Sequence, residues 1–68
     1  MSSKRLSRMI RELREANGHL TQRDLARRAG MTPGYIAQLE MGQKTNPSLL
    51  VLRRLAKALK VPLVELLK

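Results

Sequence analysis

The sequence predicts an all-α fold: a compact bundle of five short helices forming a single domain over residues 1–68. Aliphatic residues recur at helical spacing in several segments, and residues that begin or end helices separate these segments. No stretch alternates polar and apolar residues as a half-buried strand does. Because the chain has no Phe, Trp or Cys and one Tyr, its core must be aliphatic and free of disulfides.

The first predicted helix covers residues 3–17. Ser3 is a residue type that caps helices, and Gly18 stands where a left-handed end residue belongs. Its apolar residues repeat at helical spacing: Leu6, Met9, Ile10 and Leu13. Basic residues occupy the other side, which is most simply a solvated face: Lys4, Arg8 and Arg11.

The second and third predicted helices are shorter, over residues 22–29 and 33–41. Thr21, with Asp24 three residues later, has the spacing of a capping box, and Gly30 ends the second helix. Its inward residues are Leu25, Ala26 and Ala29. The third helix has its own end signals and a narrow apolar stripe: Thr32 as N-cap, Pro33 at the first position, Gly42 after the end, and Ile36 and Leu39 facing inward.

The fourth predicted helix runs from about residue 48 to residue 59, after a loop that ends at Pro47. Its wide apolar face consists of Leu49, Leu52, Leu55, Ala56 and Leu59. Pro62 then opens a last short helix whose inward residues are Leu63, Leu66 and Leu67.

Charge narrows the class of partner. The chain has 14 Lys and Arg residues against five Asp and Glu residues, a net charge of +9. A small domain needs less charge than this for solubility, and the excess repels itself. A polyanionic partner is therefore expected, with nucleic acid as the first candidate, an anionic membrane as the second, and a solvated surface as the alternative to both.

The second and third helices meet at a three-residue turn, residues 30–32. Gly30 supplies the positive φ that such a turn needs, and Ala26 must be small because the two helices cross closely there. Ile36 and Leu39 fill the angle between them. A small residue, a glycine and an apolar pair at these offsets are the signature of a helix-turn-helix.

The stretch QRDLARRAGMTPGYIAQLEMGQKTNPSLLVLRRLAKALKVPLVELL resembles the phage-repressor and Cro-like (XRE-type) helix-turn-helix DNA-binding domains. The resemblance spans residues 10–67. Its marks are Gln22, Ala26, Gly30, Ile36, the run Leu39-Glu40 followed by Gly42, and Pro47-Ser48. The resemblance implies a lambda-repressor-like fold in which residues 33–41 lie in the major groove of double-stranded DNA.

The third helix presents one face to the core and the opposite face outward. At 100° per residue the outward face comprises Gly34, Ala37, Gln38 and Met41. Gln38 is the best candidate base reader, since a Gln can bond adenine N6 and N7 together; the alternative is a solvated side chain. Pro33 and Gly34 stand where relatives often carry polar readers, so we interpret them as a bare tip that lets the backbone approach DNA closely.

Phosphate contacts are expected around this helix. The resemblance assigns one to Gln22, at the N-terminal, anion-attracting end of the second helix, and Arg23 is next to it. Thr32 and Tyr35 flank the outward face and could reach a phosphate or a thymine methyl; the alternatives are capping for Thr32 and packing for Tyr35. Relatives also grip the DNA backbone with the following loop, here Lys44, Thr45 and Asn46.

Arg14 and Glu40 lie at the margin of the core, each four residues after an isoleucine. Relatives pair these positions in a partly buried salt bridge. The resemblance therefore implies a structural ion pair that fixes the first helix against the third.

Little in the sequence indicates a metal site, an active site, a secretory signal or a membrane span. His19 is alone, without Cys or clustered carboxylates, and no nucleophile–base pair or phosphate-cradling glycine loop is present. We therefore expect no metal, no cofactor, no small-molecule ligand and no enzymatic activity. The N-terminal segment lacks the apolar core of a secretory signal, and the longest uncharged run, residues 29–39, is too short to span a bilayer, so a cytoplasmic protein, nucleoid-associated when bound to DNA, is expected.

The expected function is sequence-specific DNA binding by a small transcriptional regulator of the repressor, restriction–modification controller or antitoxin type. Relatives bind two-fold operators as homodimers, and Val64, outside the inward face of the last helix, is a candidate dimer contact. The alternative is a coactivator-type protein-interaction module with little sequence specificity. Binding to an acidic membrane through the first helix ranks last because the core needs that helix's apolar side.

Overall fold

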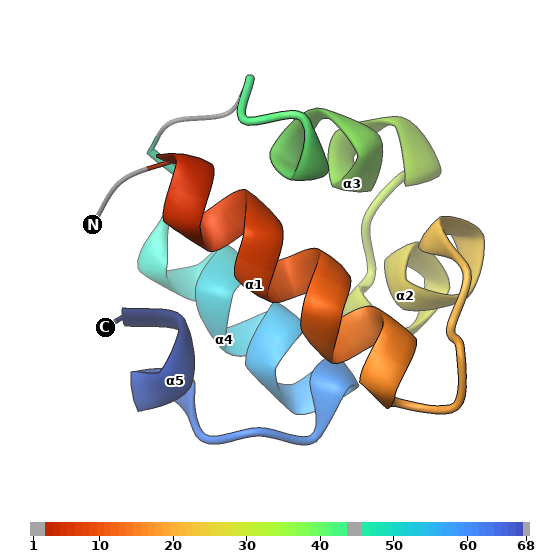
Figure 1. The fold of residues 1–68 in the computed structure, drawn as a ribbon. Helices are drawn as coiled ribbons and strands as arrows, with labels where there is room; N and C mark the ends of the chain where they lie inside the picture. Colours follow the sequence, from red (N-terminus) through yellow and green to blue (C-terminus); the bar gives the residue numbers. More distant parts are fainter. Residues whose placement is uncertain (1–2, 44–45, 68) are drawn as a thin grey trace.

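A computed structural model describes residues 3–43 and 46–67, and every regular element within them is helical. The elements are α1 (Ser3–Ala16), α2 (Gln22–Ala29), α3 (Pro33–Glu40), α4 (Leu49–Leu59) and α5 (Leu63–Leu67) (Figure 1). They pack into a body of 25 × 23 × 20 Å. The all-α, five-helix fold expected from the sequence is therefore confirmed.

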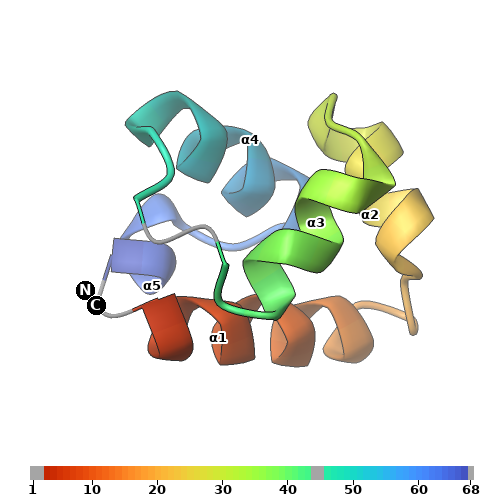
Figure 2. The same ribbon diagram turned by 90° about the horizontal axis from the view of Figure 1, so that it is seen from above.

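The helices pack around α1 and α4. α1 contacts α3 along one side and α5 along the other, and α4 contacts both α2 and α5. Figure 2 looks down on α3, which lies between α1 and α2 on the upper surface of the molecule. This arrangement leaves one long side of α3 outside the bundle.

Three of the helices begin at hydrogen-bonding caps. At α2 the Thr21 hydroxyl accepts from the Asp24 N–H at 3.0 Å and the Asp24 carboxylate accepts from the Thr21 N–H at 3.4 Å, which confirms the capping box. The Thr32 hydroxyl accepts from the Tyr35 N–H at 3.1 Å and so caps α3 as expected. Ser48 caps α4 rather than lying inside it.

The same three helices share one kind of C-terminal end. A left-handed residue follows each end, directly after α2 and α4 and two residues after the end of α3, and the next N–H bonds a carbonyl five residues back, as in a Schellman motif. The bonds are Met31 to Ala26 at 2.8 Å, Gln43 to Gln38 at 2.9 Å and Val61 to Ala56 at 3.0 Å. Gly30 and Gly42 take the left-handed position after α2 and α3 as expected, whereas Lys60 takes it after α4.

Two expected helix ends shift by one residue. α1 ends at Ala16 rather than at residue 17; Asn17 lies in the turn that follows, and its side chain donates to the Leu59 carbonyl at 2.6 Å. That bond ties the end of α1 to the end of α4. α3 ends at Glu40, and Met41, expected to be its last residue, is the C-cap.

The core is aliphatic, and its fully buried members come from all five helices: Ile10, Leu25, Ile36, Leu39, Leu55, Leu59 and Leu66. Met9, Leu13 and Leu63 are only partly buried against it. Leu20 and Ala58 are also buried, although the apolar spacing did not predict it.

Two leucines expected to face inward do not. Leu49 is 52% exposed because it is the first residue of α4, where the helix enters the bundle; Val51 is the first residue to pack against the core and Leu52 the first to be buried. Leu67 is 45% exposed because it ends a five-residue helix in which Leu63 and Leu66 already cover the core. Both predictions of inward packing were wrong.

Candidate nucleic-acid interface

The helix-turn-helix is built from α2, the turn at residues 30–32, and α3. Ala26 is 1% exposed, and its carbonyl accepts the Met31 N–H that closes the end of α2. Gly30 has φ +70°, a conformation that costs a residue with a Cβ about 1 kcal/mol or more. Ile36 and Leu39 are buried between α3 and its neighbours. These four residues therefore hold α3 at a fixed angle to α2, as the sequence predicts.

The outward face of α3 separates from its inward face as the helical periodicity predicts. Gly34 is exposed, Ala37 and Gln38 are half-buried, and the adjoining Met41 is 62% exposed. The Gln38 side chain forms no hydrogen bond with another described residue, so its amide is available to a ligand. The face is small and largely apolar, with one side-chain amide at its centre.

The tip of α3 does not need its glycine for folding. A Cβ built at Gly34 meets no atom within 4 Å, and the backbone there is not left-handed. The Gly34 N–H, at the second position of the helix, has no partner among the described residues. Pro33 lacks an N–H of its own, so this tip presents bare backbone rather than side-chain hydrogen-bonding groups.

Thr32 and Tyr35 lie beside this tip. The exposed Thr32 hydroxyl accepts the Tyr35 N–H as the helix cap, and its own O–H proton can still donate to a ligand. Tyr35 is half-buried and packs against the core, which is the alternative role expected for it from the sequence. Capping and packing both leave part of each side chain on the surface.

Glu40 joins three helices at the far end of α3. Its carboxylate is 2% exposed and accepts two hydrogen bonds from Arg14, from Nε at 2.7 Å and from Nη2 at 3.0 Å. The structure thus contains the ion pair that the resemblance implies, as a bidentate salt bridge between α1 and α3. Gln22, at the start of α2, donates to the same carboxylate at 3.1 Å.

The electrostatics of this cluster favour an ionised Glu40. Burial alone would raise the pKa of the carboxyl, but hydrogen bonds from Arg14 and Gln22 and the charges of Arg14 and Arg11 outweigh it. The pKa of Glu40 therefore lies below its ordinary value. The pKa of Arg14 is raised, chiefly by its hydrogen bond to Glu40.

Arg11 lies on an exposed face of α1, as expected, but it also contacts Glu40, which the sequence did not predict. It donates from Nη2 to the Glu40 carbonyl at 3.2 Å, and its Nε lies 3.8 Å from the carboxylate. A cation near the last carbonyls of a helix complements the helix dipole. The sequence does contain a signal for this contact, because Arg11 and Arg14 are three residues apart and so lie on the same side of α1.

The remaining candidate contacts flank α3. Gln22 is half-buried at the first position of α2, where its bond to Glu40 sets its direction, and Arg23 beside it is exposed. Asn46 is exposed after α3, while Lys44 and Thr45 lie outside the described residues.

Within residues 3–43 and 46–67, no three His, Cys, Asp or Glu side chains lie close enough to hold a metal ion. No helix in these ranges is long and apolar enough to cross a membrane.

Several known proteins are similar to this chain in sequence and in fold. A helix-turn-helix family model matches residues 10–66. The solved restriction–modification controller protein C.AhdI from Aeromonas hydrophila is 38% identical, with 94% of each chain covered and a TM-score of 0.87. SinR, the master regulator for biofilm formation, solved in complex with DNA, is 28% identical over 93% of this chain and 98% of its own, with a TM-score of 0.86.

A third solved structure agrees. The clp gene regulator ClgR from Corynebacterium glutamicum is 30% identical over 98% of this chain and 69% of its own, with a TM-score of 0.85. No curated protein sequence matches the chain. Because the family model covers most of the chain and C.AhdI is similar over nearly its whole length, the chain belongs to the helix-turn-helix family.

Proposed function

We propose that this protein is a sequence-specific DNA-binding transcriptional regulator that inserts α3 into the major groove of a duplex. The observation that carries the proposal is the outward face of α3, where a glycine unneeded for folding and an uncommitted Gln38 amide lie on a rigidly held helix. The net charge of +9 suits a phosphate backbone. The likeness to SinR, whose solved structure contains DNA, also supports it.

The contacts divide into base reading and backbone binding. Gln38 reads an adenine edge, Met41 adds an apolar contact beside it, and the Pro33–Gly34 tip lets the helix approach the bases closely. Backbone phosphates are bound around the helix by Gln22, Arg23, Thr32, Tyr35, Lys44, Thr45 and Asn46. Specificity then depends on a small number of base contacts and on DNA shape.

One copy of the domain reads only a few base pairs, so we propose that it acts as a homodimer on a two-fold operator, with half-sites about 34 Å apart. The outer side of α5 supports a contact between copies, because Val64 is 55% exposed there next to Leu67. A cytoplasmic regulator of the repressor, restriction–modification controller or antitoxin type fits these features, as a single binding domain without catalysis.

Selection of bound sites from a random duplex library tests the proposal. We expect an enriched two-fold sequence, two copies per duplex by native mass spectrometry, and a steep fall of affinity with salt, with a log–log slope of about −0.9 per phosphate neutralised. Gln38→Ala should relax preference at one position of each half-site. Arg23→Gln should instead weaken binding to all sequences and lower the salt slope by about 1.

Two outcomes would contradict it. No duplex binding at low salt would exclude DNA as the partner and favour a protein-interaction module. Binding without any enriched sequence would exclude the regulator role while leaving a general affinity for polyanions.

A further inference from the structure

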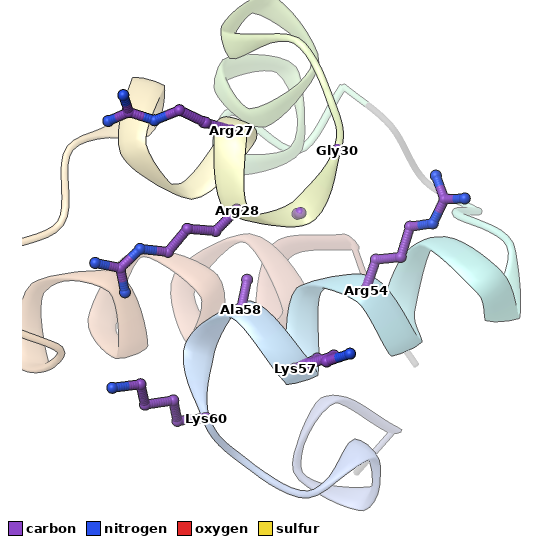
Figure 3. A pocket seen from close by; sticks show the side chains of 8 residues that line it. Arg27, Arg28, Gly30, Arg54, Lys57, Ala58 and Lys60 are labelled. Atoms are coloured by element: carbon purple, nitrogen blue, oxygen red, sulfur yellow. The ribbon is translucent and has the colours of Figure 1, made fainter.

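A groove of about 570 Å³ lies between the C-terminal end of α2 and α4 (Figure 3). Small residues form its floor: Ala29, Gly30 and Ala58. Five basic side chains surround it: Arg27, Arg28, Arg54, Lys57 and Lys60. No carboxylate is among the described residues that line it.

Most of this positive charge is uncompensated. Arg27 forms a salt bridge with Asp24 at 2.7 Å, but the other four cations pair with no acidic side chain in the described part of the chain. Figure 3 shows Arg28 and Lys60 reaching toward the same side of the groove from two different segments, with Ala58 between them. Like charges around one groove repel one another, so an anionic occupant would reduce that repulsion.

Helix dipoles account for only part of the cluster. Basic residues in the last turns of α2 and α4 complement the partial negative charge of those helix ends. Arg54, however, lies five residues before the end of α4, and dipole effects fade within the last turn. Two carbonyls near each end are also already bonded by backbone N–H groups, those of Gly30 and Met31 at α2 and those of Lys60 and Val61 at α4.

The groove lies away from the proposed DNA interface. In Figure 3 the groove is on the α4 side of α2, and α3 is on the other side of α2. A duplex resting on α3 would have to curve around a body only 20–25 Å across to reach it. DNA has a persistence length of about 50 nm, so such curvature is costly, and a flexible anionic chain suits the groove better.

We infer that this groove binds an extended, acidic peptide segment of another protein. Arginine guanidinium groups bind carboxylates in a bidentate geometry, and the lysines add point charges along the groove. The small floor lets a peptide backbone approach between the basic side chains. This surface is separate from α3, so the inference does not rest on DNA binding.

The test uses the whole chain and two capped peptides, hexaglutamate and hexaglutamine, in NMR titrations at about 0.1 M salt, where the Debye length is about 10 Å and distant charges contribute little. Hexaglutamate should shift the backbone amide signals of Ala29, Gly30 and Ala58, and hexaglutamine should not. Arg28→Gln/Lys57→Gln should raise the Kd for hexaglutamate about fivefold or more.

The matched control is Lys4→Gln/Arg8→Gln, which removes one Arg and one Lys from exposed positions on α1 and should change that Kd less than about twofold. Arg54→Gln/Lys60→Gln provides an independent second variant of the groove. Equal weakening by the groove and control variants would overturn the inference, because binding would then follow net charge. A larger loss of duplex affinity than of peptide affinity in the groove variants would overturn it in favour of nucleic acid.

Discussion

At the scale of single residues, Glu40 links three helices through one side chain. Its carboxylate receives hydrogen bonds from α1 and α2 while its own helix is α3. Both the carboxylate and the Arg14 guanidinium are largely removed from water, at 2% and 15% exposed. Removing one member of such a pair leaves the other buried without compensation, so loss of Glu40 should weaken the attachment of α3 to α1 and α2.

Glu40→Ala should therefore lower the free energy of unfolding by about 3 kcal/mol, measured by urea denaturation at neutral pH. Glu12→Ala removes an exposed carboxylate from α1 and should cost less than about 0.5 kcal/mol. Equal unfolding midpoints for the two variants would show that the cluster does not stabilise the fold.

The same carboxylate predicts an acid sensitivity. Because the pKa of Glu40 is lower in the folded chain than in the unfolded chain, the unfolded state binds more protons in acid. The stabilisation is present above the ordinary glutamate pKa of about 4.3 and is lost as the pH falls through the folded value. Unfolding free energies measured from pH 7 down to acid should fall more for the wild type than for Glu40→Gln, and parallel curves would contradict this assignment.

Substitutions at Gly34 can change stability and duplex binding in opposite directions. Alanine fits without a clash, so Gly34→Ala should raise the free energy of unfolding by up to about 1 kcal/mol. If the tip approaches DNA closely, the same change should weaken duplex binding, and Gly34→Gln should alter base preference in a site selection. Unchanged affinity and unchanged preference would mean that the tip does not touch the bases.

At the scale of elements, α2, α3 and α4 begin and end mainly through signals in their own sequence. Thr21, Thr32 and Ser48 cap the starts of α2, α3 and α4. Left-handed residues end the same helices. These interactions span at most six residues, which is why their positions could be predicted without the fold.

The left-handed ends give a paired prediction. Gly30→Ala should lower the free energy of unfolding by about 1 kcal/mol, because alanine is strained at φ +70°. Lys60→Gly should raise it by up to about 1 kcal/mol, because lysine already carries that strain at φ +59°. Thermal melts of the two variants should move in opposite directions, and shifts in the same direction would contradict the shared end motif.

At the scale of the whole molecule, the proposed dimer depends on the outer side of α5. Val64→Asp should leave the thermal midpoint nearly unchanged, since the residue is exposed, but should weaken binding to a two-fold site by tenfold or more while sparing a half-site. His19→Asp, in the exposed loop before α2, adds the same charge elsewhere and serves as the control. Analytical ultracentrifugation of the two variants would show whether each still self-associates as the wild type does. Equal affinity of the two variants for the two-fold site would place the dimer contact elsewhere.

The sequence by itself determined the number of helices, their bounds to within a residue, and the turn between α2 and α3, because caps, glycines and apolar spacing act over short distances along the chain. It did not determine which side chains face the core at helix ends, as the exposed Leu49 and Leu67 show. Nor did it determine that Arg11 and Gln22 join the expected Arg14–Glu40 pair, or that basic residues of α2 and α4 enclose one groove. Those features join residues distant in sequence, and only the packing of the helices against one another decides which of them come together.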